Sequence, residues 1–227
     1  MSKTIIITGS TGNLGKPISD HLARKNTVID LAKSLGHDLT DENFVKTFFK
    51  DNKADILVNL FGLNDHVKKS NNSYDLDLFG ISLESFREFM EVNLTSLFSV
   101  CREYARNNKA GSIINFSSIY GLVSPRPDLY TKNEKHIGYG VSKSGVIQIT
   151  KHLAAHLAPN IRVNCIAPGG VQTEEIKEFS KQYSQHVPMK RMMKPHELFG
   201  IIDYLCSESS SYTTGAVFVI DGGWTII

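Results

Sequence analysis

Short runs of consecutive apolar residues alternate along the chain with longer segments in which apolar residues recur every three or four positions. The unbroken runs, rich in β-branched residues, predict buried strands, and the recurring positions predict amphipathic helices. The predicted strands cover residues 4–7, 27–29, 55–59, 112–116, 161–166 and 216–220. The predicted helices cover residues 16–25, 41–50, 83–105, 140–157 and 195–205. This alternation is typical of a three-layer α/β/α fold, in which helices cover both faces of a doubly wound parallel sheet.

No internal repeat, low-complexity tract or proline- or serine-rich linker divides the sequence, so residues 1–227 are predicted to form a single domain. Two connections, residues 63–80 and 122–137, are longer and more polar than a minimal β-α-β unit requires. Both follow predicted strands, and open parallel sheets bind ligands beyond the carboxyl ends of their strands. A role beside a ligand and a surface insertion without function therefore both stay open for these connections.

Composition and charge exclude several classes of function. A net charge of +2 gives no electrostatic signature of a protein that binds nucleic acid or a membrane surface, and no signal peptide or membrane-spanning stretch is present. The cysteines at positions 101, 165 and 206 form no C-x-x-C pair, so a reducing cytoplasm is expected rather than a disulfide framework. His152 and His156 stand four apart on one predicted helix, but without a third ligand they predict no metal site.

A glycine-rich segment, residues 8–15 (TGSTGNLG), links the first predicted strand to the first predicted helix. Its glycines allow a tight turn and a close approach of the backbone to a ligand. The helix amino terminus that follows offers free N–H groups and a partial positive charge to a pyrophosphate. Its place between strand and helix favours a dinucleotide site over a plain turn, although the spacing is not G-x-G-x-x-G.

Tyr139 and Lys143 form a Y-x-x-x-K pair at the start of a predicted helix, where residues four apart share one face. A nearby ammonium group favours the phenolate and lowers the pKa of a tyrosine from about 10 towards neutrality, so that it can donate and recover a proton. Alone, this pair is a common accident. Ser118, however, follows the strand that ends at Phe116, and Asn93 stands inside a predicted helix, where asparagine is unfavourable. Together the four polar residues indicate a catalytic site.

These residues resemble the short-chain dehydrogenase/reductase family, in the family's order and over nearly the whole chain. The matching segments are residues 8–15, 38–41 (DLTD), 59–62 (NLFG), 92–94 (VNL), 115–118 (NFSS), 139–143 (YGVSK), 162–170 (RVNCIAPGG) and 221–223 (DGG), with Gly215. The resemblance implies a Rossmann-like fold and an NAD(P)-dependent oxidoreductase that interconverts a carbonyl and an alcohol by hydride transfer. A non-catalytic dinucleotide sensor or regulatory protein with the same fold is the alternative.

By this resemblance, Tyr139 is the general acid in reduction and the base in oxidation, and Lys143 holds the nicotinamide ribose and keeps the phenol acidic. Ser118 positions the substrate by a hydrogen bond, and Asn93 supports Lys143 in a proton relay through water. The cofactor is expected to contact Gly9, Thr11, Asn13, Leu14, Gly15, Asp30, Lys33, Ser34, Asp38, Leu39, Asn59, Phe61, Gly62, Tyr139, Lys143, Pro168, Gly169, Val171 and Thr173. The family also implies a homodimer or homotetramer, built on helix 83–105 and the helix after Tyr139.

The sequence departs from the family's pattern at four places. Asn13 replaces a glycine, and residues 60–61 (LF) replace Asn-Ala, which makes the wall beside the adenosine bulkier. The spacing between the catalytic serine and tyrosine is longer than usual, so a loop at about 120–137 must lie over or beside the active site. The connection over residues 29–38 is too short for the helix usually found there.

The residue that ends the second strand chooses between NAD and NADP, because a carboxylate there accepts from the ribose 2′-OH and repels a 2′-phosphate. Asp30 could do this, but counting from Gly15 puts the expected position nearer Ala32 or Lys33. Lys33 and Ser34 would suit a 2′-phosphate. NADP(H) is therefore slightly preferred, and NAD(H) stays open.

The substrate is expected to be a small carbonyl or alcohol compound. The 120–137 loop carries aromatic and polar side chains that suit a sugar or nucleotide-sugar: Tyr120, Arg126, Asp128, Tyr130 and Lys132. Residues 118–121 (SIYG) with this long loop are similar to a branch of the family near bacterial sugar-modification genes, and a generic carbonyl reductase is the alternative. Residues 168–194 should form a mobile lid over the substrate.

Overall fold

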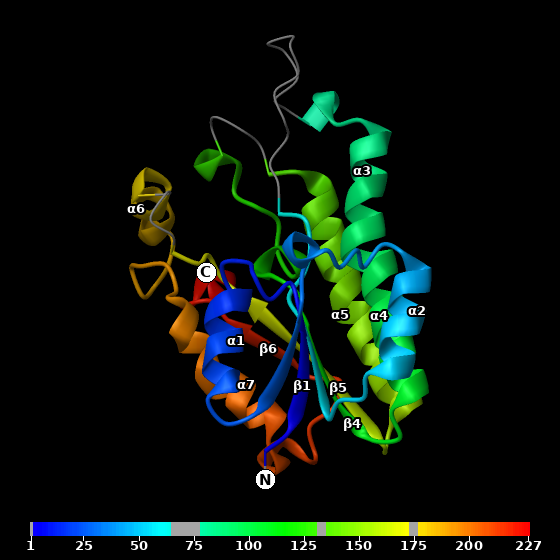
Figure 1. The fold of residues 1–227 in the computed structure, drawn as a ribbon. Coiled ribbons are helices and arrows are strands. Elements are labelled where there is room, and N and C mark those ends of the chain that lie inside the picture. Colours follow the sequence, from blue (N-terminus) through cyan, green and yellow to red (C-terminus); the bar gives the residue numbers. More distant parts are fainter. Residues whose placement is uncertain (1, 65–77, 131–134, 173–176) are drawn as a thin grey trace.

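The computed structural model describes residues 2–64, 78–130, 135–172 and 177–227. Within these ranges, six strands form one sheet in the order β2-β1-β3-β4-β5-β6 (Figure 1). The strands are β1 (Thr4–Thr8), β2 (Thr27–Leu31), β3 (Ile56–Asn59), β4 (Gly111–Phe116), β5 (Ile161–Pro168) and β6 (Val217–Ile220). Every neighbouring pair is parallel, so the carboxyl ends of the strands lie along one edge. The predicted doubly wound α/β fold is confirmed.

Helices cover both faces of this sheet. The α-helices of the described residues are α1 (Gly15–Ala23), α2 (Glu42–Asp51), α3 (Leu83–Met90), α4 (Ser96–Asn107), α5 (Ile137–Leu157), α6 (Lys177–Gln185) and α7 (Phe199–Cys206). Figure 1 shows α1 and α7 on one face and α2, α4 and α5 on the other. Successive side chains of a strand point to opposite faces, so Ile5 and Ile7 are buried with Ile18 of α1, while Ile6 is buried with Phe49 of α2. Two apolar cores explain why the strands read as unbroken apolar runs.

The predicted helix 83–105 is in fact α3 and α4 joined by a π-helical turn, Glu91–Thr95. Asn93 lies within this turn and is buried. The wide turn is stabilised by the Ser96 hydroxyl, which donates to Glu91 O at 2.8 Å. Single π-turns inside α-helices occur frequently at functional sites, because they change the direction in which one side chain projects.

The connection after β2 contains a single 3₁₀ turn, Lys33–Leu35, in place of an α-helix, as the short spacing predicts. Gly36 follows it with a φ of 85°, a conformation that favours glycine. The chain then enters α2, whose N-cap Asp41 accepts from the backbone N–H groups of Asn43 and Phe44. This compact route brings Ser34 to Thr11 of the glycine-rich segment, so that their hydroxyls share a hydrogen bond.

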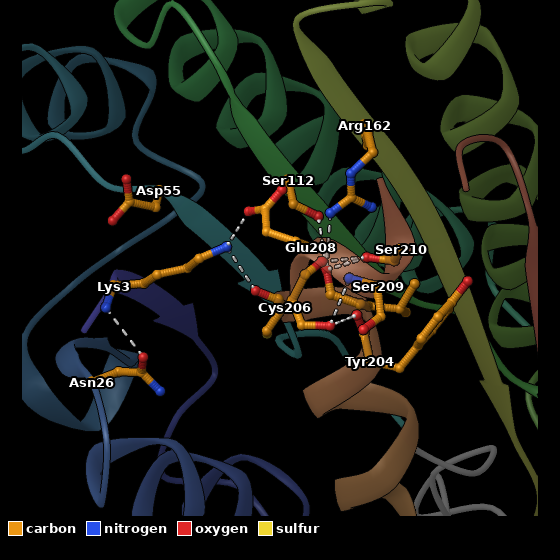
Figure 2. Close-up of polar contacts among 12 residues, drawn as sticks. Lys3, Asn26, Asp55, Ser112, Arg162, Tyr204, Cys206, Glu208, Ser209 and Ser210 are labelled. Atoms are coloured by element: carbon orange, nitrogen blue, oxygen red, sulfur yellow. Dashed lines mark hydrogen bonds and ion pairs between the residues drawn. The ribbon is translucent and has the colours of Figure 1, made fainter. Parts of the chain in front are cut away.

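Polar contacts hold the opposite, amino edge of the sheet together (Figure 2). Lys3 Nζ, just before β1, donates to Cys206 O at 3.0 Å and to Glu208 Oε1 at 3.1 Å. Arg162, on β5, donates to Leu205 O at 3.2 Å. These bonds join β1 and β5 to the end of α7, so that polar groups at the amino edge of the sheet are paired with one another.

Some predicted features lie outside the described residues, namely Thr173, Lys132 and most of the 63–80 connection. Helix α6 lies inside the segment predicted to be a lid and is not foreseen by the apolar pattern. In the part of the chain that the structure describes, none of the helices combines the length and the apolar character needed to cross a membrane.

Candidate active site

A cavity of about 630 Å³ opens at the carboxyl edge of the sheet. The glycine-rich segment lines one end, and the residues after β4, the first turn of α5 and the segment after β5 line the other. Predicted site residues among its lining are Gly9, Asn13, Leu14, Gly15, Gly62, Ser118, Tyr139, Lys143, Pro168, Gly169 and Val171. Elements that are far apart in the sequence thus meet around one space, which is long enough to run from a helix amino terminus to the tyrosine.

The glycine-rich segment turns tightly after β1, with Gly9 N and Ser10 N bonded to Leu31 O and Gly12 N bonded to Gly9 O, and it leads into the amino terminus of α1. Gly9 has a φ of 70°, and a Cβ there would lie 2.5 Å from Phe61 N. A Cβ on Gly15 would collide with Gly9 O. Leu14, the N-cap of α1, offers no side-chain acceptor to the first turn of the helix. These free donors and the helix dipole suit the pyrophosphate of a dinucleotide.

Polar side chains cluster where the second strand ends. The hydroxyls of Thr11 and Ser34 lie 2.8 Å apart and share a hydrogen bond. The Asp38 carboxylate accepts from the Thr40 hydroxyl at 2.6 Å and from its backbone N–H at 2.9 Å. These two bonds and the charge of Lys33 lower the pKa of Asp38. The cluster therefore combines hydroxyl donors, one cation and one firmly ionised carboxylate at the exposed end of the site.

Asp30 does not belong to that cluster. It stands one residue before the end of β2, and its carboxylate accepts from the Ser19 hydroxyl of α1 at 2.8 Å. Ala32, which is buried, follows the strand. Strand β2 ends at Leu31, and Lys33 and Ser34 follow Ala32, so the choice between Asp30 and Lys33 at the adenosine ribose stays a prediction.

Asn59 is another predicted cofactor residue whose side chain turns inward. Its Oδ1 accepts from Thr8 Oγ1 at 3.0 Å, and its Nδ2 donates to Asn115 Oδ1 at 2.9 Å. Asn115 Nδ2 in turn donates to Thr150 Oγ1 at 3.0 Å. This buried chain of bonds joins β1, β3, β4 and α5 below the cavity. Leu39 and Phe61 likewise pack against the core beside α2. The side chains of Leu39 and Asn59 are buried, whereas that of Phe61 is partly exposed.

Tyr139 lies in the first turn of α5, which begins differently from the predicted helix. The N-cap is His136, whose Nδ1 accepts from Gly138 N at 3.0 Å. Its Nε2 lies 3.0 Å from Ser85 Oγ, and its ring stacks on Phe89 with 4.4 Å between centroids. Because Nδ1 accepts, the neutral ring carries its proton on Nε2. Sequence reasoning missed this buried histidine, which fixes the start of the helix that carries Tyr139.

The catalytic triad of the resemblance, Ser118, Tyr139 and Lys143, comes together at the cavity. Burial raises the pKa of Tyr139, and the Ser118 hydroxyl acts against that effect through a hydrogen bond. Lys143 Nζ donates to Phe116 O at 2.9 Å and lies 5.8 Å from the Tyr139 ring centroid. Burial lowers the pKa of Lys143 to about 8. The pKa of Tyr139 therefore lies above its ordinary value in this structure, in the direction opposite to the expected lowering, because burial has the largest effect on it.

Asn93 acts as a clamp on the segment after β3. Its Oδ1 accepts from Leu63 N at 2.6 Å, and its Nδ2 donates to Leu63 O and to Ser142 Oγ, both at 3.0 Å. Gly62 passes so close that a Cβ there would lie 2.9 Å from Asn93 Oδ1 and 3.6 Å from Lys143 Nζ. Asn93 thus lies beside Lys143 and joins the π-turn, the segment after β3 and α5.

Aromatic side chains form the far wall of the cavity. The hydroxyls of Tyr120 and Tyr130 lie 2.8 Å apart, and burial raises the pKa of both, for Tyr130 to about 12. Tyr183 of α6 stacks on Trp224 with 4.4 Å between centroids and accepts from Gly170 N at 2.7 Å. Arg126 and Asp128 of the same loop instead pair with each other at the surface. The neighbouring lining residues Phe179 and Lys135, like Tyr183, were missed by sequence reasoning.

Comparison with known proteins agrees with this geometry. A family model described as enoyl-(acyl carrier protein) reductase matches residues 11–225. The chain is 32% identical to a 3-oxoacyl-(acyl-carrier-protein) reductase of Aquifex aeolicus, over 97% of this chain and 86% of that protein.

Solved structures match over almost the whole length as well. A short chain dehydrogenase from Leptospira borgpetersenii with bound NAD+ superposes with a TM-score of 0.84 at 29% identity, over 99% of this chain and 93% of that one. A putative 2-deoxy-D-gluconate 3-dehydrogenase from Agrobacterium tumefaciens with bound NADP gives a TM-score of 0.83 at 25% identity, over 99% and 97%. The similarity covers both ends of the cavity.

Proposed function

Because the chain belongs to the short-chain dehydrogenase/reductase family, it is an NAD(P)-dependent oxidoreductase that interconverts a carbonyl and an alcohol, and we propose that Tyr139 moves the proton. The observation that carries the proposal is the meeting of Ser118, Tyr139 and Lys143 at one end of a cavity whose other end is the glycine-rich segment. The similarity to named reductases and dehydrogenases disfavours a non-catalytic sensor.

In the reducing direction, the hydroxyls of Ser118 and Tyr139 hold the carbonyl oxygen of the substrate, and the proton of Tyr139 moves to that oxygen. A bound nicotinamide supplies the hydride, and in oxidation accepts it. Since burial raises the pKa of Tyr139, the phenol is fully protonated at neutral pH and ready to donate. Lys143 stabilises the phenolate that remains, because its ammonium lies in a poorly solvated site. The aromatic wall excludes water from the reacting atoms.

The direct test is Tyr139→Phe, which removes the proton but keeps the ring. We expect kcat to fall by roughly 10²-fold or more, the usual scale of general acid–base catalysis, with cofactor affinity unchanged. The assay follows NADPH or NADH absorbance against a panel of carbonyl compounds. Tyr212→Phe is the matched control, because Tyr212 is fully exposed. A Tyr139→Phe rate within a few-fold of the wild type would refute the assignment.

NADP(H) is the cofactor that we propose, since Lys33 and Ser34, which follow β2, suit a 2′-phosphate. Lys33 and Ser34 supply a cation and a hydroxyl there, and the Asp30 carboxylate is turned to Ser19. Lys33→Ala is expected to weaken NADP(H) about ten- to hundredfold, the value of one charged hydrogen bond, and to leave NAD(H) unchanged. Asp30→Ala should change neither affinity. Tighter binding of NAD(H) by the wild type, with no effect of Lys33→Ala, would contradict the choice.

The substrate and the assembly complete the proposal. A sugar-like carbonyl or alcohol is supported by the paired hydroxyls of Tyr120 and Tyr130 and by the likeness to a structure named for a deoxygluconate.

A homodimer or homotetramer is supported by Phe98 of α4 and Val141 of α5, which are 43% and 45% exposed. Light scattering at micromolar concentration tests this, and a monomer alone would contradict it. Three buried free thiols favour the cytoplasm.

A further inference from the structure

We infer that Tyr183 of α6 is a positioning residue for the reaction, because its hydroxyl holds the backbone of Gly170 in place at the edge of the cavity. This inference rests on the proposed function, since it concerns the alignment of the groups that react beside Tyr139. Both Tyr183 and Gly170 line the cavity. Tyr183 belongs to none of the motifs by which the chain resembles its family, and it acts through Gly170 rather than on the substrate.

The backbone that Tyr183 contacts continues from β5 into the wall of the cavity. The pairing of β5 with β6 reaches Pro168, and the N–H of Gly169 still donates to Ile220 O of β6 at 2.9 Å. The next N–H, that of Gly170, donates to the hydroxyl oxygen of Tyr183 at 2.7 Å. The tyrosine thus supplies the acceptor that a neighbouring strand supplies inside the sheet, at the point where the sheet has ended.

Close packing adds to this hydrogen bond. A Cβ placed on Gly170 would lie 2.7 Å from Tyr183 Cζ, so the ring lies directly against the glycine backbone. A Cβ on Gly169 would lie 3.2 Å from the same hydroxyl oxygen. The carbonyl of Gly170 accepts from Met193 N at 2.9 Å. Both polar groups of Gly170 are therefore bonded to residues of the segment that follows it, and Tyr183 holds one of the two.

The ring of Tyr183 is itself held in a fixed position. It is 2% exposed and stacks on Trp224, with 4.4 Å between the centroids and 11° between the planes. Trp224 lies in a C-terminal turn in which Asp221 accepts from the backbone N–H groups of Gly223 and Thr225, both at 2.8 Å. A hydroxyl on a ring packed in this way has a defined place, so the Gly170 backbone is positioned before a ligand binds.

The backbone that Tyr183 positions belongs to the end of the cavity where Tyr139 lies. Pro168, Gly169 and Val171, the neighbours of Gly170, line the same cavity and are predicted contacts of the cofactor. Hydride transfer needs the two reacting carbons at contact distance, and a displacement of about 1 Å can lower a rate about 10²-fold. Loss of the bond to Gly170 lets this wall move, and the rate falls although the phenol of Tyr139 is unchanged.

The experiment compares Tyr183→Phe with Tyr104→Phe. Tyr183→Phe keeps the ring and its stack on Trp224 and removes the acceptor of the Gly170 N–H. We expect kcat to fall about tenfold, with the KM of the carbonyl substrate changed by less than about threefold. Tyr104 is the matched control, because it is fully buried, its hydroxyl donates to Ala54 O at 3.0 Å, and it does not line the cavity. Tyr104→Phe should keep the wild-type kcat, although it also loses a buried hydrogen bond.

Two further measurements separate positioning from a general loss of structure. Trp224 is the only tryptophan in the sequence, so its fluorescence emission reports on the stack, and Tyr183→Phe should leave that emission unchanged. Amide hydrogen exchange should become faster at Gly170 in Tyr183→Phe and stay at the wild-type rate in Tyr104→Phe. A fall in kcat together with a changed emission would mean that the packing of the ring, and not its hydroxyl, sets the backbone, and would overturn the inference.

Wild-type kcat in Tyr183→Phe, or an equal loss of kcat in Tyr104→Phe, would also overturn the inference while the proposed function stands. If Tyr183→Phe does not fold, Trp224→Leu takes its place, because it loosens the same ring and keeps the hydroxyl. A lower kcat in Trp224→Leu with faster exchange at Gly170 supports the inference, and wild-type kcat in that variant overturns it. A wild type that reduces no carbonyl compound, with Tyr139→Phe no different, would end the proposed function itself.

Discussion

Replacing Asn93 by alanine removes the clamp on the segment after β3. The side chain is buried and makes three hydrogen bonds, one accepted from Leu63 N at 2.6 Å and two donated, to Leu63 O and Ser142 Oγ, at 3.0 Å. Each bond contributes about 1 kcal/mol net, so Asn93→Ala is expected to lower the free energy of unfolding by about 3 kcal/mol. Alanine leaves the N–H and C=O of Leu63 without these partners, and unpaired polar groups in a buried place lower the stability further.

Activity should fall as well, because Asn93 joins the segment after β3 to α5, the helix that carries Tyr139 and Lys143. We expect kcat to fall in the folded variant, since Lys143 lies next to the loosened segment. Urea unfolding at fixed pH gives the stability, and steady-state kinetics well below the midpoint gives the activity. Asn43→Ala, at an exposed position in the first turn of α2, is the matched control.

Two results would refute this reasoning in different ways. Wild-type stability of Asn93→Ala would show that the three bonds are exchanged for water without loss, so the clamp has no energetic weight. A less stable Asn93→Ala enzyme with wild-type kcat and KM would show that the clamp supports the fold alone. Only a joint loss of stability and kcat agrees with a positioning role.

Two further predictions concern stability. Burial lowers the pKa of Lys143 from 10.5 to about 8, so the unfolded state binds more protons between these values and stability rises with pH across that window. At pH 7, Lys143→Met is therefore expected to be more stable than the wild type by up to about 3 kcal/mol, reduced by the loss of the hydrogen bond to Phe116 O. When urea denaturation is repeated at higher pH, this difference in stability should become smaller towards pH 10. A difference that does not change with pH would contradict the prediction. Thr150→Val leaves Asn115 Nδ2 without its acceptor and should lower the free energy of unfolding by about 1–3 kcal/mol, as measured by urea denaturation. An unchanged midpoint would show that the buried hydrogen bonds that run from Thr8 through Asn59 to Asn115 do not contribute to stability.

Most of the fold could be predicted from local pattern. The run 4–7 and the other buried strands lie close to their predicted bounds, because a parallel strand covered on both faces requires consecutive apolar residues. Helix α6 could not be predicted in this way. Its buried side chain, Tyr183, is held by Trp224 and by Gly170, which come from distant parts of the chain. The π-turn around Asn93 could not be predicted either, because it depends on contacts with Leu63 and α5 rather than on helical periodicity.

Some residues of the candidate site could likewise be predicted from the sequence, and others could not. Ser118, Tyr139 and Lys143 were predicted from a strand end, the Y-x-x-x-K spacing and the resemblance to the family, and the structure brings all three to the cavity. Lys135 was not found, because its partner Asn64 is 71 residues away. The orientation of Asp30 towards Ser19 also depends on how α1 packs against an edge strand. No local pattern contains that information.

The sequence by itself determined the parallel α/β fold, the glycine-rich end of the cavity and the presence of Ser118, Tyr139 and Lys143 at its other end. These features depend on residues that are neighbours along the chain or at helical spacing, so composition and order are enough. Only the tertiary structure decided the direction of the Tyr139 pKa shift, the inward turn of Asn59 and the place of the Lys135 ammonium beside the Tyr139 ring. Solvent exclusion and charge proximity are properties of three-dimensional neighbours, and those neighbours come from β1, β3, β4 and α5 together.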